Sequence, residues 1–91
     1  MRRIDTRVLV RLVAESGDSA AALALYEYSM RLGHGKIALL RYLDAKDLAA
    51  PLSESHDTYA RAVAATLSGS EVEKIARHAL EKSRLRRRRS R

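Results

Sequence analysis

The residues whose type and spacing most directly suggest chemistry are the arginines at the C-terminal end. Arg84, Arg86 to Arg89, and Arg91 place six guanidinium groups within eight residues that contain no acidic side chain. Arginine suits phosphate because its planar group donates paired hydrogen bonds and stays charged at any physiological pH. A run of this density predicts an arm that binds nucleic acid. The alternatives are a solvated, charged helix end, or an arm that binds an acidic protein or an anionic membrane surface.

Most of the positive charge belongs to this end of the chain. The 91 residues carry 18 basic and 11 acidic side chains, which gives a net charge of +7. Residues 1–83 hold 12 of the basic and all 11 of the acidic side chains, so their net charge is only +1. We therefore expect a single domain over 1–83 and a flexible, disordered basic tail over 84–91. Six phosphate contacts to duplex DNA would give a slope of log K against log salt of about −5.

A second candidate lies at Gly33-His34-Gly35, where two helical patterns meet. Ser29 is a small residue four positions before Gly33, which can adopt the positive φ of a tight turn, and Leu39 can pack the two helices together. The stretch Tyr28–Ala45 resembles the helix-turn-helix of the phage-repressor family, with Ser29, Gly33 and Leu39 at its small, turn and buried aliphatic positions. The resemblance implies that the groove-facing start of the second helix holds Gly35, Lys36, Ala38 and Arg41.

In this interpretation Lys36 meets a phosphate or the edge of a guanine, and Lys36 and Arg41 supply position or some base readout. The local charge is modest, because residues 33–49 hold three basic and two acidic side chains. The alternative is an ordinary αα-hairpin, in which Gly33 ends one helix and Ser29 lies at a close helix crossing.

Hydrophobic periodicity predicts about five helices in one all-α domain. These are expected to begin at Asp5 or Thr6, Asp18 or Ser19, Lys36, Ser53 and Ser70, and to end near Glu15, Leu32, Ala49, Gly69 and Arg84. Residues 4–13 also permit a β-strand, since their core is rich in β-branched side chains. For the last helix, Ser70 and Glu73 predict a capping box. Its expected inward residues are Val72, Ile75, Ala76, Ala79 and Leu80.

The predicted helix over 19–32 is apolar on nearly all sides, so it needs packing partners on more than one side. The chain has four tyrosines and neither Phe nor Trp, which predicts a core of small aliphatic side chains. Small domains with such cores often gain buried surface by association. We therefore expect a homodimer, either side by side or intertwined.

Several classes of function lack the residues that they require. The absence of cysteine excludes disulfides and thiol chemistry. The three histidines lie on three different predicted elements, so we expect no metal site, no cofactor and surface or capping roles for these residues. No nucleophile motif or phosphate loop indicates an enzyme or a small-molecule substrate. The longest apolar run, Ala20 to Tyr26, is too short to cross a bilayer, and we expect a cytoplasmic protein.

A further likeness concerns the first two predicted helices. Leu9, Ala22, Tyr26 and Ser29, with Gly17 at the turn, resemble one tetratricopeptide hairpin. Taken whole, the chain also resembles small plasmid-borne helical proteins of plant-pathogenic bacteria such as Xanthomonas. The main prediction is a non-enzymatic protein that binds nucleic acid, most readily duplex DNA, as a plasmid or phage regulator. The alternative is a helical adaptor between proteins, whose basic tail directs it to an acidic partner.

Overall fold

Five helices make up residues 5–89, the part of the chain that the computed structural model describes. They are α1 (Thr6–Ser16), α2 (Ser19–Leu32), α3 (Gly35–Asp47), α4 (Glu54–Thr66) and α5 (Gly69–Arg89). No β-strand occurs within these limits, so the prediction of an all-α fold is confirmed. Of the segment 4–13 that also permitted a strand, residues 6–13 are helix, Asp5 is the N-cap, and residue 4 lies outside the described residues. The predicted homodimer concerns contacts between chains and stays a prediction.

Local sequence signals account for most helix ends. The side chain of Asp5 accepts a hydrogen bond from the backbone N–H of Arg7, and Asp18 accepts one from Ala21, so both acids cap the helices that follow them. Gly17 and Gly33 close α1 and α2 with φ of 59° and 70°. This left-handed conformation favours glycine, which has no Cβ to clash.

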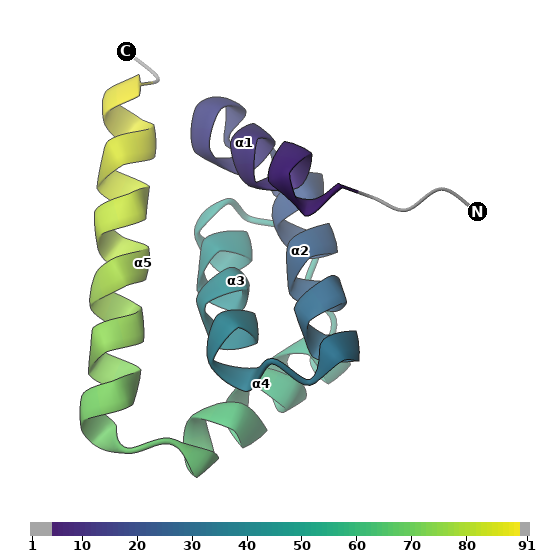
Figure 1. Ribbon diagram of the computed structural model, residues 1–91, viewed down its shortest axis with the longest axis vertical. Coiled ribbons are helices and arrows are strands. Elements are labelled where there is room, and N and C mark those ends of the chain that lie inside the picture. The colour runs from purple at the N-terminus through teal and green to yellow at the C-terminus, as the bar shows by residue number, and fades with distance from the viewer. Residues whose placement is uncertain (1–4, 90–91) are drawn as a thin grey trace.

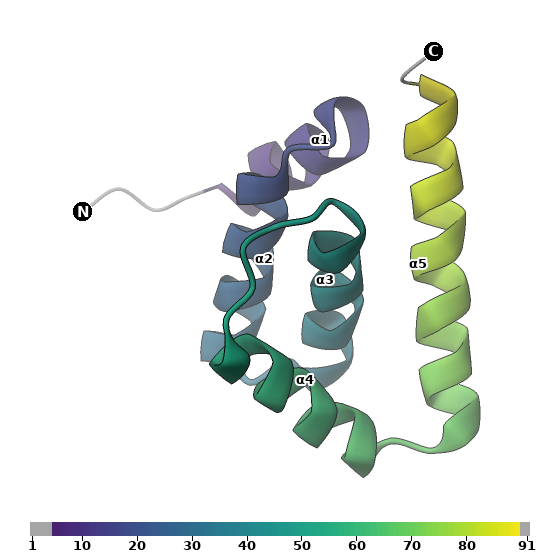
Figure 2. The same cartoon turned by 180° about the vertical axis from the view of Figure 1, so that it is seen from behind.

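The α2–α3 pair lies at the centre of the molecule. The two helices run side by side in opposite directions, and α5 runs along the outer side of α3 in the same direction as α3 (Figure 1). Figure 2 shows α4 crossing near the end of this pair where the α2–α3 turn lies, while α1 packs at the other end. Helix α5 contacts α3 along its length and α1 near its C-terminal end.

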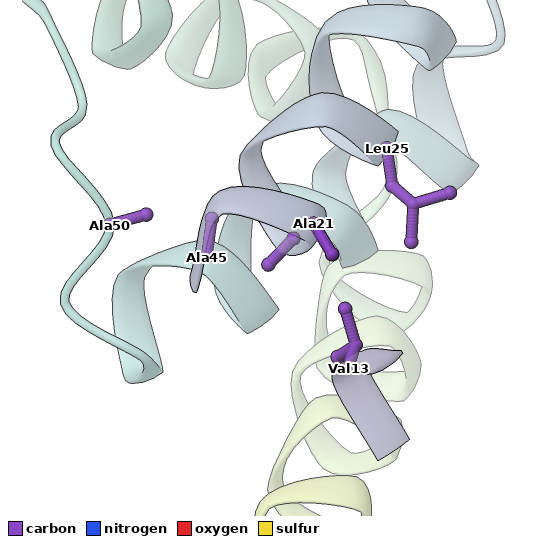
Figure 3. Close-up of a cluster of buried hydrophobic side chains, with 6 residues drawn as sticks. Val13, Ala21, Leu25, Ala45 and Ala50 are labelled. Atoms are coloured by element: carbon purple, nitrogen blue, oxygen red, sulfur yellow. The ribbon is translucent and has the colours of Figure 1, made fainter. Parts of the chain in front are cut away.

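The core has two parts. Figure 3 shows small aliphatic side chains converging from several segments, namely Val13 on α1, Ala21 and Leu25 on α2, Ala45 on α3 and Ala50 beyond it. The second part surrounds Tyr26, which is completely buried on α2 and lies against Tyr42, His56 and Tyr59. Burial on several sides of α2 agrees with the prediction made from its nearly continuous apolar surface.

Helix α5 differs most from expectation. It begins two residues earlier than the Ser70–Glu73 capping box predicted: the hydroxyl of Ser68 accepts from the N–H of Glu71, and the Glu71 carboxylate accepts from the N–H of Ser68. The helix also continues through 84–89, so the prediction of a disordered tail from residue 84 is wrong over these residues. Carboxylates of α3 neutralise part of the arginine charge and so permit the longer helix.

The inward face of α5 is also different. Leu80 and Ala76 were predicted to face inward but are exposed, Leu80 to 49%. The buried side chains in their place are Ser83 and Arg86, at 4% and 7% exposure. The contact between α5 and the rest of the molecule is therefore largely polar.

Candidate nucleic-acid interface

The residues predicted to shape the α2–α3 joint occupy packing positions. Ser29 and Leu39 are 5% and 6% exposed, and Gly33 is the left-handed residue that ends α2. Gly35 begins α3 close to α4, where a Cβ atom would lie 3.3 Å from Cγ1 of Val63. These residues therefore bring the start of α3 against both α2 and α4.

The basic residues of the joint have partners within the chain. The ammonium of Lys36 lies 2.5 Å from a carboxylate oxygen of Glu71 on α5. The hydrogen bond from Lys36 is the main cause that lowers the pKa of the Glu71 carboxyl, with the backbone N–H of Ser68 assisting. Arg41 is only 19% exposed and lies 3.9 Å from Asp44. Both predicted DNA contacts at the joint thus have part of their charge balanced internally.

The hairpin places the joint away from the arginines. Helices α2 and α3 are antiparallel neighbours joined through Gly33 and His34 (Figure 1). The start of α3 lies beside the start of α5, whereas Arg86 and Arg87 lie beside the end of α3, about 18 Å further along the helix axis. The structure therefore does not bring Lys36 together with Arg84–Arg89. The helix-turn-helix and tetratricopeptide resemblances stay predictions.

At the arginine-rich end, several charges form a network between two helices, which we call the α3–α5 ion-pair network. It joins two acids of α3 to bases of α3 and α5: Asp44, Asp47, Arg41, Lys82, Arg86 and Arg87. Arg86 was predicted to meet phosphate. Its side chain is one of the least exposed charged groups of residues 5–89 and attaches α5 to α3 through Asp44 and Asp47. Its contact with phosphate stays a prediction.

Asp44 is the most buried member of the network, with 1% of its side chain exposed. One carboxylate oxygen accepts a hydrogen bond of 2.6 Å from Lys82, and the other lies 3.5 Å from a guanidinium nitrogen of Arg86. Burial of a carboxylate is costly unless positive partners compensate it. Two cations from α5, with Arg41 nearby, provide that compensation.

Asp47 lies nearer the surface and also binds two bases. One oxygen accepts from Arg86 at 2.8 Å, and the other lies 3.4 Å from Arg87. Burial raises the pKa of the Asp47 carboxyl, but hydrogen bonds from Arg86 and Ser83 and the charges of both arginines outweigh it, so the net pKa is lowered. Asp47 therefore stays ionised at neutral pH.

Three arginines near the end of α5 face solvent, and we call Arg84, Arg87 and Arg88 the arginine face. Their spacing of three and four residues places them on one side of the helix. The side chain of Arg87 is 75% exposed although it contacts Asp47. No carboxylate of residues 5–89 lies within ion-pair distance of Arg84 or Arg88. The side chain of Arg89 and all of Arg91 lie outside the described residues.

The acids that organise this region were missed in the sequence. Asp44 and Asp47 were regarded only as surface charges that lower the net charge of α3. A usable signal was present, because these acids are three residues apart and the bases Lys82 and Arg86 are four apart. Each pair therefore lies on one face of its helix, and the two faces can match when the helices pack side by side.

His56 takes part in the cap at the start of α4. Its Nδ1 accepts a hydrogen bond of 2.9 Å from the backbone N–H of Ser53, and the backbone N–H of His56 donates to the Ser53 hydroxyl, which completes a capping box at the start of α4. Its Nε2 lies 3.4 Å from Glu27 on α2. Within residues 5–89, no cluster of His, Asp or Glu side chains could hold a metal ion.

The described helices also lack a segment that is long and apolar enough to cross a membrane. Comparison of the chain with family models, curated proteins and solved structures finds no match. A function for this chain must therefore be inferred from the packing and charges described above.

Proposed function

We propose that this chain is a non-enzymatic protein that binds nucleic acid, with duplex DNA as the main target, through the arginine face of α5. The observation that carries the proposal is the exposure of Arg84, Arg87 and Arg88 on one side of a continuous helix. Arg84 and Arg88 have no carboxylate partner among the described residues, so their hydrogen-bonding capacity is available to phosphate.

The helical backbone strengthens this proposal compared with a disordered arm. A helix fixes Arg84 and Arg88 about 6 Å apart along its axis. Less conformational freedom is then lost on binding, which favours affinity. Contacts of this kind act on the phosphate backbone, so they give affinity that depends on salt and hardly on base sequence.

The α2–α3 joint has a secondary place in the proposal. Lys36 is 64% exposed even though it is paired with Glu71, so it can still contact a phosphate at a second point. A homodimer would present two arginine faces and two such joints to one duplex, and the two linked contacts would raise the overall affinity. The dimer and the base-reading role of α3 both belong to the proposal.

Fluorescence anisotropy of a labelled random duplex tests the proposal with the full chain. Arg84→Gln/Arg88→Gln removes two exposed charges without touching the α3–α5 ion-pair network. Arg61→Gln is the control for the loss of one exposed arginine elsewhere, because Arg61 lies on α4, away from the arginine face. We expect the double substitution to make the slope of log K against log salt shallower by about 2, because each phosphate contact contributes about 1.

The outcomes separate the candidate partners. Binding that weakens in the double variant and stays near the original value in Arg61→Gln supports the arginine face. A loss in Arg61→Gln that is half the loss in the double variant indicates that only net charge matters, which contradicts a defined face. A full chain that does not bind duplex at low salt contradicts the proposal, and direct titration of a labelled single-stranded RNA then shows whether RNA is bound instead.

The alternative, an adaptor between proteins, is favoured by one observation. Tyr28, Leu32 and Ile37 are 40%, 49% and 49% exposed and flank the α2–α3 joint. Exposed apolar side chains that lie near one another often mark protein contacts. If the full chain fails to bind any nucleic acid, Leu32→Ser and Ile37→Ser provide variants for testing self-association by analytical ultracentrifugation.

A further inference from the structure

Asp47 holds its two arginines in very different ways. Its contact with Arg86 is 2.8 Å long, and the Arg86 side chain is 7% exposed. Its contact with Arg87 is 3.4 Å long, and the Arg87 side chain is 75% exposed. The same carboxylate therefore makes one short, partly buried ion pair and one long, exposed pair.

The two arginines differ in how much free energy it costs to separate each of them from Asp47. An ion pair in solvent contributes little, because water solvates both charges and the long side chain loses freedom when it is held. Arg86 also contacts Asp44, so releasing it would leave a buried charge poorly compensated. Arg87 can leave Asp47 at low cost, whereas Arg86 cannot.

The surroundings of Asp47 also permit the exchange. A cavity of about 150 Å³ lies between α1, α3 and α5, and its lining includes Gly17, Asp47, Ser83 and Arg87. Water in this cavity can solvate the carboxylate when Arg87 moves away. Arg86 and Ser83 remain as hydrogen-bond partners of Asp47 in that state.

We propose that Asp47 is an internal competitor for nucleic-acid phosphate, and that Arg87 exchanges this carboxylate for phosphate while Arg86 keeps α5 attached to α3. This inference rests on the function proposed above. It makes the three exposed arginines unequal: Arg84 and Arg88 bind phosphate without losing a partner, whereas Arg87 must first leave Asp47. Asp47 thereby limits the affinity for any polyanion.

A double-mutant cycle with the same duplex tests this proposal. We expect Asp47→Asn to bind about two- to five-fold more tightly, because an exposed ion pair of this strength no longer competes. In an Arg87→Gln background the same substitution should change affinity little. Glu81→Gln is the matched control, since it removes one negative charge from α5 at an exposed position with no ion pair among the described residues. The gain in affinity from Glu81→Gln should be the same with Arg87 present and in the Arg87→Gln background.

The proposal is overturned if Asp47→Asn gives no gain, or if its gain is the same with and without Arg87. Should Asp47→Asn fail to fold, as judged by circular dichroism, the single variants Arg84→Gln and Arg87→Gln decide the matter. The first must lose more affinity than the second, and equal losses contradict the exchange. A wild-type chain that does not bind at low salt refutes the proposed function itself, whereas normal binding without the cycle's coupling refutes only the role of Asp47.

Discussion

Two regions of the molecule are stabilised by different interactions, one mainly by aromatic packing and the other mainly by ion pairs. Around Tyr26, helices α2, α3 and α4 join through ring contacts with centroids 5.4–6.3 Å apart and through a buried hydrogen bond from the Tyr26 hydroxyl to the carbonyl of His56. Between α3 and α5, the buried side chains contributed by α5 are Ser83 and Arg86. Its apolar residues Val72, Ile75 and Ala79 are only half-buried.

The difference bears on function. A contact built on apolar burial is insensitive to polyanions, whereas a contact built on ion pairs shares its chemistry with phosphate binding. Residues of α5 therefore divide into those that attach the helix and those that are exposed to solvent. Arg86 and Arg87 are adjacent in sequence but belong to opposite sides of this division.

The largest expected effect comes from Asp44→Asn. This change leaves Lys82 and the buried Arg86 without their shared carboxylate, and breaking one side of a buried pair typically costs about 3 kcal/mol or more. For a chain of this size that corresponds to a fall in Tm of about 12 °C or more, measurable by thermal denaturation followed by circular dichroism.

Glu73→Gln is the control for Asp44→Asn. Glu73 pairs with Arg77 at 2.7 Å, but both side chains are more than 60% exposed. Such pairs on a helix surface contribute about 0.5 kcal/mol or less. If both variants lose the same small amount, the α3–α5 ion-pair network is no stronger than a surface pair, and the contrast between the two regions fails.

Tyr26→Phe tests the other region and should have a smaller effect. Deleting the hydroxyl removes a 2.6 Å hydrogen bond to the His56 carbonyl, with an expected loss of about 1 kcal/mol in the free energy of unfolding. Urea denaturation at neutral pH measures it. No change in the denaturation midpoint would show that this hydrogen bond does not contribute to stability.

The same variant reports on alkaline pH. Burial, followed by the charges of Tyr42, Tyr59 and Asp57, raises the pKa of Tyr26 from 10.0 to about 12. A raised folded-state pKa means that the full stabilisation is present below pH 10 and is lost as pH rises toward 12. We expect Tyr26→Phe to lose less stability than the wild type over this interval.

Features of the fold that depend on neighbouring residues could be predicted from the sequence. The cap at Ser53 and the glycine that ends α2 depend on neighbouring residues, so local patterns predicted them correctly. For α1 and α2 the sequence left two candidates each, Asp5 or Thr6 and Asp18 or Ser19, and the structure shows that the acid is the cap in both. The burial of α2 followed from its apolar composition. These features do not depend on which distant element lies alongside.

The orientation and length of α5 depend on such a distant element and were predicted incorrectly. Apolar spacing assigned Leu80 to the inward face, but the partners of Lys82 and Arg86 on α3 determine which side of α5 is buried. The arginines were grouped as one set because their sequence is uniform. Only the packed structure separates the buried Arg86 from the exposed residues.

Acid should weaken the α3–α5 contact by protonating the Asp47 carboxylate, whereas alkali leaves this group ionised. The pKa of Asp47 is lowered in the folded state, so its stabilisation is present above the unfolded pKa of 3.8 and is lost as pH falls below that value. We expect Asp47→Asn to flatten the stability profile between neutral pH and pH 3, as measured by urea denaturation at each pH. An unchanged acid profile would show that Asp47 does not stabilise the folded chain.

The smallest expected effect is a stabilisation that comes from neither region. Ala49, just beyond α3, has a φ of 56°, and alanine in this left-handed conformation costs about 1–2 kcal/mol. Glycine removes that strain, but it also gives the unfolded chain more conformational freedom, which lowers the free energy of unfolding by about 0.4–1 kcal/mol. Ala49→Gly should therefore raise the free energy of unfolding by about 0.5 kcal/mol in thermal denaturation, while DNA affinity stays constant. A gain in DNA affinity would mean that the strained end of α3 affects how Asp47 holds Arg87. Attachment of α5 and binding of phosphate would then be coupled through the backbone of α3.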